Sequence, residues 1–395
     1  MKQRLIRIGL VFAQNLSYCR GVMRGIKEFA ASRPDWVLLP VAPESRAVRA
    51  LASLRPAALI AHVFSQPLAR AVQALGCPFV NVSGAMREPL RPRVGTDDRR
   101  CGQLAAEHLL DRGFRHFAFA GHWDHFYSVT REAAFREAIE RAGYQVASFH
   151  EARRQPFEPL GRLWSLDERI RRWMQGLPRP VAIFASNDIW GMQLTEVCRQ
   201  ARMRVPEDVA ILGVDNDDLL CELARPALSS IVVPAERVGF EAATLLERLL
   251  KGKDAPEEAL LFPPSGVVPR RSSDVLAITD PEVAAAVRFI RDNGHRPLQT
   301  RDVLAAVPVS RRSLERRFRE SLGRTPHDEI RRVHVEHACR LLTETDLLMH
   351  AVAEQSGFSD AKQLSVVFRQ VLGQTPTAYR VSLRGPTGRW GRKNE

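Results

Sequence analysis

Short apolar runs recur along the first two thirds of the chain, and each ends in serine, asparagine, aspartate or glycine or leads into a helical pattern. They predict buried strands at residues 5–13, 36–41, 57–64, 77–83, 114–121, 181–187 and 209–216. Amphipathic helical patterns separate most of these runs, at residues 17–33, 101–113, 131–143 and 189–201. This alternation predicts mainly parallel sheets, in which ligands bind at the carboxyl ends of the strands. Residues 1–270 hold too many strands for one core, so we predict two similar α/β lobes.

The pattern then changes. Residues 262–281 are rich in proline, serine and glycine, which is typical of a linker, and helical patterns without strands follow. Near the end of the chain, apolar positions recur at the spacing of an amphipathic helix: Leu364, Val367, Phe368, Val371 and Leu372. Gly357 can supply the positive φ of a tight turn before this helix, and Ser359 stands at the expected N-cap. The sequence therefore predicts a helix-turn-helix.

An internal repeat supports this interpretation. The segment FRESLGRTP (318–326) matches FRQVLGQTP (368–376), and Ser310 stands at the N-cap of the earlier helix. A connecting helix spans the apolar positions between Ile330 and Leu342. At about 1.5 Å per residue it separates the two recognition helices by roughly 25 Å, against roughly 34 Å between successive major-groove faces. One chain is therefore expected to reach both.

Charge points to the same class of partner. The formal net charge is +13, which favours a polyanion, and five arginines with one glutamate stand between positions 311 and 319. The six cysteines form no CxxC pair and no cluster, so we expect reduced thiols in the cytoplasm. No apolar run reaches about 18 residues, so we expect no membrane span.

Catalytic and metal patterns are weak. His122, Asp124 and His125, and separately His334 and His337, have metal-like spacing, but neither group has further matching ligands. The sequence contains no GxSxG, no phosphate-binding Gly-Lys-Ser/Thr loop and no GxGxxG after a strand. We therefore predict no metal, no cofactor and no enzymatic activity.

The C-terminal segment, about 283–383, resembles the AraC/XylS-type DNA-binding domain. The matching signature positions are Gly357, Phe358, Phe368, Arg369, Gly373, Thr375, Pro376, Tyr379 and Arg380. The resemblance implies two helix-turn-helix units that bind promoter DNA. It places residues 312, 315 and 316 in the major groove, where arginine suits guanine.

The expected DNA-binding residues come from both units: Arg311, Arg312, Glu315, Arg316, Arg319, Lys362, Gln363 and Arg369. Val366 stands in the second unit where an arginine is common in the family. Since valine cannot donate a hydrogen bond, we expect the second unit to show a weaker sequence preference.

Residues 5–270 resemble, in an ordered series of segments, the effector-binding core of LacI/GalR-type repressors and periplasmic sugar-binding proteins. The segments begin GTDDRRCG (95), VTREAAFR (129), ASNDIWGM (185) and LSSIVVPA (228). The resemblance implies a sugar in a hinged cleft, hydrogen-bonded by Asp97, Arg131, Asn187 and Asp215. Carboxylate and guanidinium groups suit adjacent hydroxyls, whereas each carboxylate alone could instead belong to a helix cap or a strand-end turn. Candidate aromatic contacts for the sugar are Phe12, Tyr18, Trp123, Phe126 and Trp190.

Together the two resemblances imply four parts: a two-lobed α/β sensor of the periplasmic-binding-protein type (1–270), a linker (271–282), an all-α DNA-binding domain (283–386) and a basic tail (387–395). Such a chain is expected to be a dimeric, sugar-responsive activator of pentose catabolism, with D-xylose in the interlobe cleft and RNA polymerase as a further partner. The alternatives are another pentose, a deoxy-sugar or a sugar phosphate as effector, and repression in place of activation. A secreted sugar-capture protein is disfavoured because no signal peptide is recognised, and a sugar-processing enzyme with a regulatory tail is the weaker rival.

Overall fold

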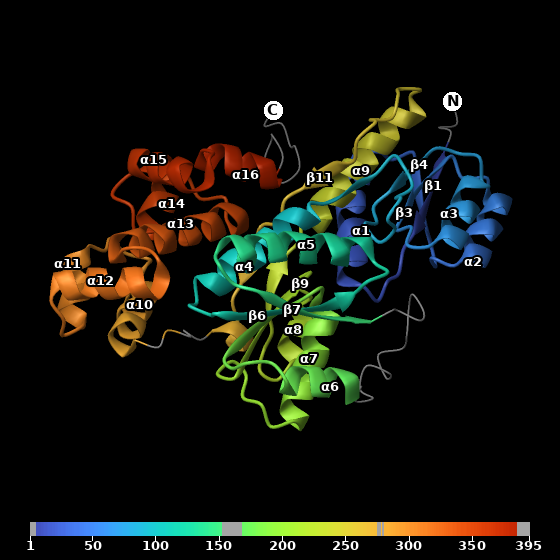
Figure 1. Cartoon of the computed structure of the whole chain (residues 1–395). Helices are drawn as coiled ribbons and strands as arrows, with labels where there is room; N and C mark the ends of the chain where they lie inside the picture. Colours follow the sequence, from blue (N-terminus) through green and yellow to red (C-terminus); the bar gives the residue numbers. More distant parts are fainter. Residues whose placement is uncertain (1–4, 152–167, 275–277, 279, 385–395) are drawn as a thin grey trace. The chain divides into compact units, whose positions relative to one another are not determined.

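The computed structural model describes residues 5–151, 168–274, 278 and 280–384. The chain forms two compact units (Figure 1). The first comprises Met1–Glu107 and His116–Asp274, and the second comprises His108–Arg115 and Val275–Glu395. Within the described residues, no helix is both long and apolar enough to cross a membrane.

One lobe of the first unit is built on a parallel four-stranded sheet with the order β2-β1-β3-β4. Its strands are β1 (Ile6–Val11), β2 (Trp36–Val41), β3 (Ala58–Ala61) and β4 (Phe79–Asn81). The helices of this part are α1 (Ser17–Ala30), α2 (Ser45–Ala50), η1 (Leu51–Leu54), α3 (Gln66–Gln73) and α9 (Ala235–Leu250). A short parallel pair, β5 (Val94–Thr96) with β11 (Leu260–Phe262), joins segments far apart in the sequence.

The other lobe contains a six-stranded sheet with the order β12-β10-β9-β8-β6-β7. Its strands are β6 (His116–His122), β7 (Val146–Glu151), β8 (Val181–Ala185), β9 (Val209–Val214), β10 (Ser229–Val232) and β12 (Gly266–Val268). Only β12 is antiparallel to its neighbour. The helices are α4 (Asp98–Leu110), α5 (Phe126–Arg141), α6 (Glu168–Gln175), α7 (Asp188–Gln200) and α8 (Asp218–Leu223). Every strand predicted from the apolar runs is present, so the predicted α/β class is confirmed.

Helices α1 and α9 pack closely because small residues line their contact. A Cβ added to Gly25 would lie 1.8 Å from the carbonyl oxygen of Glu236, and one added to Gly239 would lie 1.9 Å from that of Val22. Only glycine allows the two backbones to approach this far. Helix α1, which carries Tyr18 of the candidate cleft near its start, is therefore held firmly against α9.

The first unit extends beyond its predicted end. The structure places the boundary at Asp274, whereas the sequence predicts a linker from residue 271. The proline-rich segment pairs with β10 through β12 and continues into η3 (Arg271–Ser273). Ser272 and Ser273 are fully buried and hydrogen-bond to Ser229. Composition alone predicts a linker here. The contacts that hold this segment are made by backbone and hydroxyl groups, and such contacts leave no apolar pattern in the sequence. The predicted basic tail (387–395) lies outside the described residues.

The second unit is helical where it is described after residue 280. Its helices are α10 (Pro281–Asn293), α11 (Thr300–Ala306), α12 (Arg311–Leu322), α13 (Pro326–Glu344), α14 (Met349–Gln355), α15 (Ala361–Leu372) and α16 (Pro376–Arg384). The pairs α11–α12 and α14–α15 are the two predicted helix-turn-helix units, and α13 connects them. Phe318 and Phe368 occupy equivalent, fully buried positions in two separate hydrophobic clusters. The repeat therefore reflects two similar small cores.

The positive φ predicted for Gly357 is confirmed, the glycines that end α12 and α15 share it, and one predicted cap is wrong. Gly323, Gly357 and Gly373 have φ of 67°, 82° and 71°. The N-cap of α15 is Asp360, and not Ser359, because the Asp360 carboxylate accepts a hydrogen bond from the backbone N–H of Gln363 (2.7 Å). A carboxylate is the stronger acceptor at the positive end of a helix, so the helix begins one residue later than expected.

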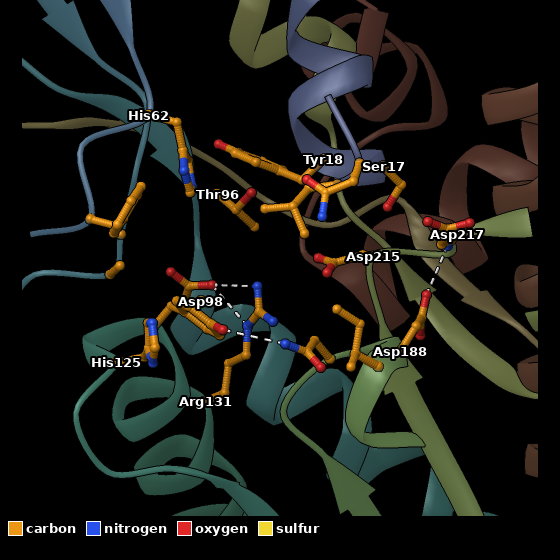
Figure 2. Close-up of a pocket in the computed structure, with 18 of the residues that line it drawn as sticks. Ser17, Tyr18, His62, Thr96, Asp98, His125, Arg131, Asp188, Asp215 and Asp217 are labelled. Carbon is orange, nitrogen blue, oxygen red and sulfur yellow. Dashed lines mark hydrogen bonds and ion pairs between the residues drawn. The ribbon is translucent and has the colours of Figure 1, made fainter. Parts of the chain in front are cut away.

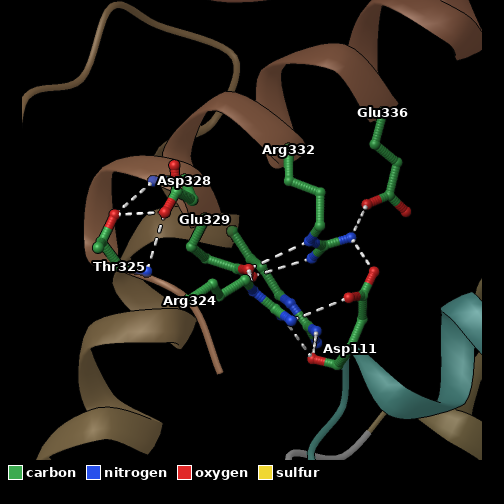
Figure 3. A network of polar contacts seen from close by, with 8 residues as sticks. Asp111, Arg324, Thr325, Asp328, Glu329, Arg332 and Glu336 are labelled. Atoms are coloured by element: carbon green, nitrogen blue, oxygen red, sulfur yellow. Dashed lines mark hydrogen bonds and ion pairs between the residues drawn. The ribbon is translucent and has the colours of Figure 1, made fainter. Parts of the chain in front are cut away.

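A buried ionic network stabilises the second unit (Figure 3). Glu329 is fully buried and accepts hydrogen bonds from Arg324 (2.7 Å) and Arg332 (2.9 Å). Asp111 pairs with the same two arginines, at 3.1 and 2.7 Å, which is how the segment His108–Arg115 belongs to this unit. Burial opposes ionisation of Glu329, but Arg332 and Arg324 hold its pKa at about 2. The carboxylates and guanidinium groups thus balance each other away from water.

Candidate functional site

A pocket in the first unit gathers side chains from both lobes. Tyr18 comes from the start of α1, His62 from the end of β3, Thr96 from the end of β5, and Asp215 from the end of β9. Figure 2 shows these groups surrounding a common space. They lie at or just after strand ends, where the predicted parallel sheets place ligands.

A buried ion pair forms one wall of the pocket. Oδ1 of Asp98, in the first turn of α4, accepts a hydrogen bond from Nε of Arg131 on α5 (2.9 Å) and forms an ion pair with Nη2 of the same side chain (2.9 Å). Arg131 also donates through Nη1 to the carbonyl oxygen of Ser186 (2.6 Å), and it is only 5% exposed. Burial raises the pKa of Asp98, whereas Arg131 and Arg93 oppose that rise. Each partner therefore keeps the other charged and in place.

The predicted carboxylate at this position, Asp97, does not line the pocket. Its Oδ1 accepts from the backbone N–H of Arg100 (3.0 Å), so Asp97 caps α4. The adjacent Asp98 lines the pocket in its place. The sequence analysis named only Asp97 at this position, although a helix start beside two neighbouring carboxylates is a signal that one of them can serve as the cap.

Asn187 lines the pocket and also caps a helix. Its Oδ1 accepts from the backbone N–H of Trp190 (3.0 Å) at the start of α7. This fixes the side chain so that Nδ2 donates to the hydroxyl of Tyr127 (3.3 Å). Tyr127 in turn lies under the guanidinium of Arg131, 4.8 Å from the ring centre. The cap thus orients the polar wall.

Asp215 ends β9 in a backbone conformation that non-glycine residues rarely adopt, with φ of 110°. Figure 2 shows its carboxylate pointing into the space between Tyr18, Asp98 and Arg131. Within the described residues, no hydrogen bond to this carboxylate is found. Burial raises the pKa of Asp215 to about 7, although Arg131 opposes the shift. A strained, poorly solvated acceptor facing a cavity is typical of a ligand-binding position.

Asp188 differs from Asp215 because its oxygens are occupied. Oδ2 accepts from the backbone N–H of Asp217 (2.8 Å), and Oδ1 accepts from the hydroxyl of Ser230 (2.5 Å). Burial, together with the nearby charge of Asp215, raises the pKa of Asp188 well above its usual value. Asp188 therefore acts as a support for the loop after β9.

Of the five predicted aromatic contacts, only Tyr18 lines the pocket, and its hydroxyl donates to the carbonyl oxygen of Val82 (2.7 Å). Phe12 and Trp190 are core residues, each 2% exposed. Trp123 and Phe126 are exposed, at 62% and 37%. The pocket takes its other rings from His125, which the sequence analysis considered only as a possible metal ligand, and from three residues that it did not single out: His62, Phe64 and Tyr127.

The histidine cluster at the end of β6 is largely committed to the protein. The ligand atoms of His122, Asp124 and His125 lie within 4.8 Å of one another. However, Nε2 of His122 accepts from the indole N–H of Trp190 (2.9 Å), and Nδ1 faces the carbonyl oxygen of Glu151 (3.2 Å). Since both ring nitrogens have partners, the donor set does not fit a metal ion.

A groove on α12 of the second unit holds four of the eight predicted DNA-binding residues. It is lined by Ser310, Arg312, Ser313, Glu315, Arg316 and Arg319. Arg311 pairs with Glu315 (2.9 Å) and Arg316 with Glu320 (2.9 Å), both along the helix. For Arg312 and Arg319, both exposed, no ion pair is found within the described residues. These two are the cations most free to meet DNA.

The equivalent helix α15 carries a different surface. Lys362, Val366 and Arg369 are exposed on it. Gln363 is exposed as well, but its side-chain oxygen accepts from the backbone N–H of Ser359 (2.9 Å). This predicted base-reading residue is therefore engaged in helix capping.

Comparison with known proteins gives the same division of the chain. A family model for a periplasmic binding protein-like domain matches residues 106–273, and one for a helix-turn-helix domain matches residues 303–382. The xylose operon regulatory protein of Escherichia coli (strain K12) is 30% identical over 95% of this chain and 96% of its own. That of Haemophilus influenzae is 27% identical over 97% and 100%. A solved structure of the xylose-binding transcription activator XylR has 30% identity and a TM-score of 0.61, and covers 96% of this chain and 99% of its own.

Proposed function

The chain belongs to the family of xylose operon regulatory proteins, and from this premise we propose that D-xylose is the ligand of the pocket and the signal for transcription. The regulator binds promoter DNA through α12 and α15 and activates genes of pentose use. The names of its relatives support the sugar and the activation. Its relatives are regulators, and the described pocket offers no catalytic constellation that we recognise.

The observation that carries the proposal is the pairing of donors and acceptors in one pocket. Asp215 offers an acceptor to which no described residue donates a hydrogen bond, next to the Asp98–Arg131 pair and the amide of Asn187. A hydroxyl group both donates and accepts, so a compact polyhydroxylated ring can satisfy such a wall from several sides. Tyr18 and Phe64 provide ring surface for the C–H face of a sugar.

Charge separates a neutral sugar from a sugar phosphate. The lining holds four carboxylates against two guanidinium groups: Asp98, Asp188, Asp215 and Asp217 against Arg93 and Arg131. A phosphoryl group would bring more negative charge into a buried, acidic site. We therefore propose a neutral pentose over a phosphorylated one.

Three further parts of the proposal concern the assembly. The regulator acts as a homodimer, because repeated half-sites on DNA favour two-fold assemblies. It contacts RNA polymerase when it activates. It works in the cytoplasm, where promoter DNA and reduced cysteines are found.

A calorimetric screen tests the proposed ligand. Purified full-length protein is titrated with D-xylose, other pentoses, deoxy-sugars and xylose phosphate. D-xylose should bind most tightly and the phosphate least. Tighter binding of another pentose would overturn the ligand, and tighter binding of the phosphate would overturn the charge argument. Chemical turnover of any sugar in the same samples would favour the rival enzyme function.

A further inference from the structure

Two buried residues of the pocket each have one polar side-chain atom with no hydrogen-bond partner within the described part of the chain. Nε of Arg93 and Oγ1 of Thr96 are enclosed and make no hydrogen bond there. The residues are 8% and 6% exposed, and both line the pocket. Buried donors without acceptors are rare and destabilising, so such a pair calls for an explanation.

The backbone around Arg93 is shaped to the guanidinium group. A Cβ added to Gly84 would lie 2.8 Å from Nη2 of Arg93 and 3.1 Å from Oδ2 of Asp98. A Cβ added to Gly95 would lie 3.0 Å from Nη2 and 3.3 Å from Nε. Two glycines therefore let the chain run against the guanidinium, which limits its movement and keeps it in the pocket wall.

We propose that Arg93 and Thr96 are sugar-binding residues that hydrogen-bond oxygen atoms of the ligand. This inference rests on the proposed function and adds to it a group of donors outside the positions that the family resemblance supplies. Arg93 donates to a hydroxyl or ring oxygen, and the Thr96 hydroxyl donates to or accepts from another. On the facing side Asp215 accepts a hydroxyl proton. The ligand thus completes a set of bonds that the protein leaves open, and a sugar that lacks one of these oxygens binds less well.

The first test is calorimetry of full-length variants with D-xylose. Arg93→Gln should weaken binding about 10- to 100-fold, the range expected for a hydrogen bond from a charged donor. Thr96→Val, which keeps the shape, should weaken it about 2- to 10-fold. Arg99→Gln is the matched control, because Arg99 is 56% exposed and pairs with Glu137 away from the pocket lining. It should bind D-xylose as the wild type does.

A second test separates ligand contact from support of the pocket. Wild type and Arg93→Gln are titrated with the monodeoxy analogues of D-xylose, each of which lacks one hydroxyl, and with the analogue that lacks the anomeric hydroxyl. If Arg93 binds one of these oxygens, the two proteins should bind the analogue without it equally well. Gly95→Ala displaces the guanidinium and should weaken binding in the wild type but add little in the Arg93→Gln background. An equal loss with every analogue, including one without the ring oxygen, would mean that Arg93 only shapes the pocket.

The outcomes are separable. A wild type that binds no pentose overturns the proposed function and this inference with it. A wild type that binds D-xylose, with Arg93→Gln equally tight, overturns this inference alone. If the variants do not fold, a crystal structure of the wild type with D-xylose decides: a sugar oxygen within hydrogen-bond distance of the Arg93 guanidinium is expected, and a ligand that touches neither Arg93 nor Thr96 contradicts the assignment.

Discussion

Asp215, the proposed acceptor in the pocket, is buried at a cost to stability. Its pKa lies at about 7 against an ordinary 3.8, so the folded protein holds this proton more tightly than the unfolded chain does. The folded state therefore loses stability as the pH rises from about 4 through 7, and the full cost of the buried charge is present above that range.

Asp215→Asn should remove this cost and replace the charged acceptor with a weaker, neutral amide oxygen. At pH 8 the sugar-free variant should melt at a higher temperature than the wild type, and this difference should be clearly smaller at pH 5, where less of the cost is present. D-xylose should bind the variant more weakly at pH 8, by about 1–3 kcal/mol, because a carboxylate acceptor is lost. Thermal melts and calorimetry at both pH values measure this. A melting difference that is the same at pH 5 and pH 8 would contradict the assigned ionisation.

Substitution of Arg131 should lower the stability of the protein, whereas Asp215→Asn should raise it. Its guanidinium is committed to Asp98 and to the Ser186 carbonyl, so Arg131→Ala leaves a buried carboxylate without its partner. We expect a loss of about 3–5 kcal/mol in the free energy of unfolding. Arg100→Ala is a fitting control, since its pair with Glu107 is partly exposed and should contribute at most about 1 kcal/mol. Denaturant titration measures the free energy of unfolding of both variants. Similar losses in the two would contradict the role assigned to the Asp98–Arg131 pair.

At this scale the sequence predicts residue types better than positions. Arg131, Asn187 and Asp215 were placed in the site by motif, and all three line the pocket. Asp97 was chosen over Asp98 because neighbouring carboxylates at a helix start look alike until the cap is known. The aromatic candidates were named by residue type, which does not say where a ring lies: Trp190 packs in the core.

At the scale of elements, the strands predicted from apolar runs are present, but the short strands β5 and β11 were not predicted. β5 and β11 contain three residues each and exist through their pairing with each other. So short a run carries too little periodicity to be recognised, and its partner lies far away along the chain. The loss matters because Arg93 and Thr96 flank and end β5, so both proposed ligand contacts escaped notice.

The capping of α15 leads to an element-scale prediction. Because Gln363 accepts from the N–H of Ser359, Gln363→Ala should lower the stability of the second unit by about 0.5–2 kcal/mol, as loss of a helix cap does. Its preference among DNA sequences should not change. Lys362→Ala, next to it and exposed, should keep stability and weaken DNA binding. Thermal melts and binding to a panel of DNA sequences measure these effects. A changed preference at one base position in Gln363→Ala would mean that Gln363 reads a base.

The α12 groove leads to a second prediction at the scale of elements. Arg312 has no ion pair among the described residues, so its guanidinium is free to bind guanine in the major groove. Arg312→Ala should weaken operator binding by about 1–3 kcal/mol and relax the preference at one base position. Competition assays with single-base operator variants measure this. A uniform loss on every sequence would identify a phosphate contact in place of base reading.

At the scale of the whole molecule, composition and repeats predicted the two-part organisation, while the boundaries depended on contacts that leave no pattern. The segment His108–Arg115 lies within the sensor half of the sequence, yet Asp111 forms ion pairs with Arg324 and Arg332 of the second unit. Single charges of this kind are common in any helix, so nothing in the sequence marks them. The linker was likewise predicted from composition alone, and its first residues form β12 and η3.

The central claim is that sugar in the pocket changes DNA binding. This requires D-xylose to bind one state of the protein better than another, since equal affinity for both would shift nothing. Allosteric coupling of the usual size, about 1–3 kcal/mol, corresponds to a change of about 5- to 150-fold in operator affinity.

The most direct measurement is operator affinity of the full-length protein with and without saturating D-xylose. The operator is first selected by the protein from random DNA in the presence of the sugar. Asp215→Asn should need much more D-xylose for the same response, whereas Arg312→Ala should bind the sugar normally and the operator poorly. For the wild type, we predict that operator affinity changes by about 5- to 150-fold and that this change saturates together with sugar binding. Operator affinity that stays the same when calorimetry shows the pocket to be full would contradict it.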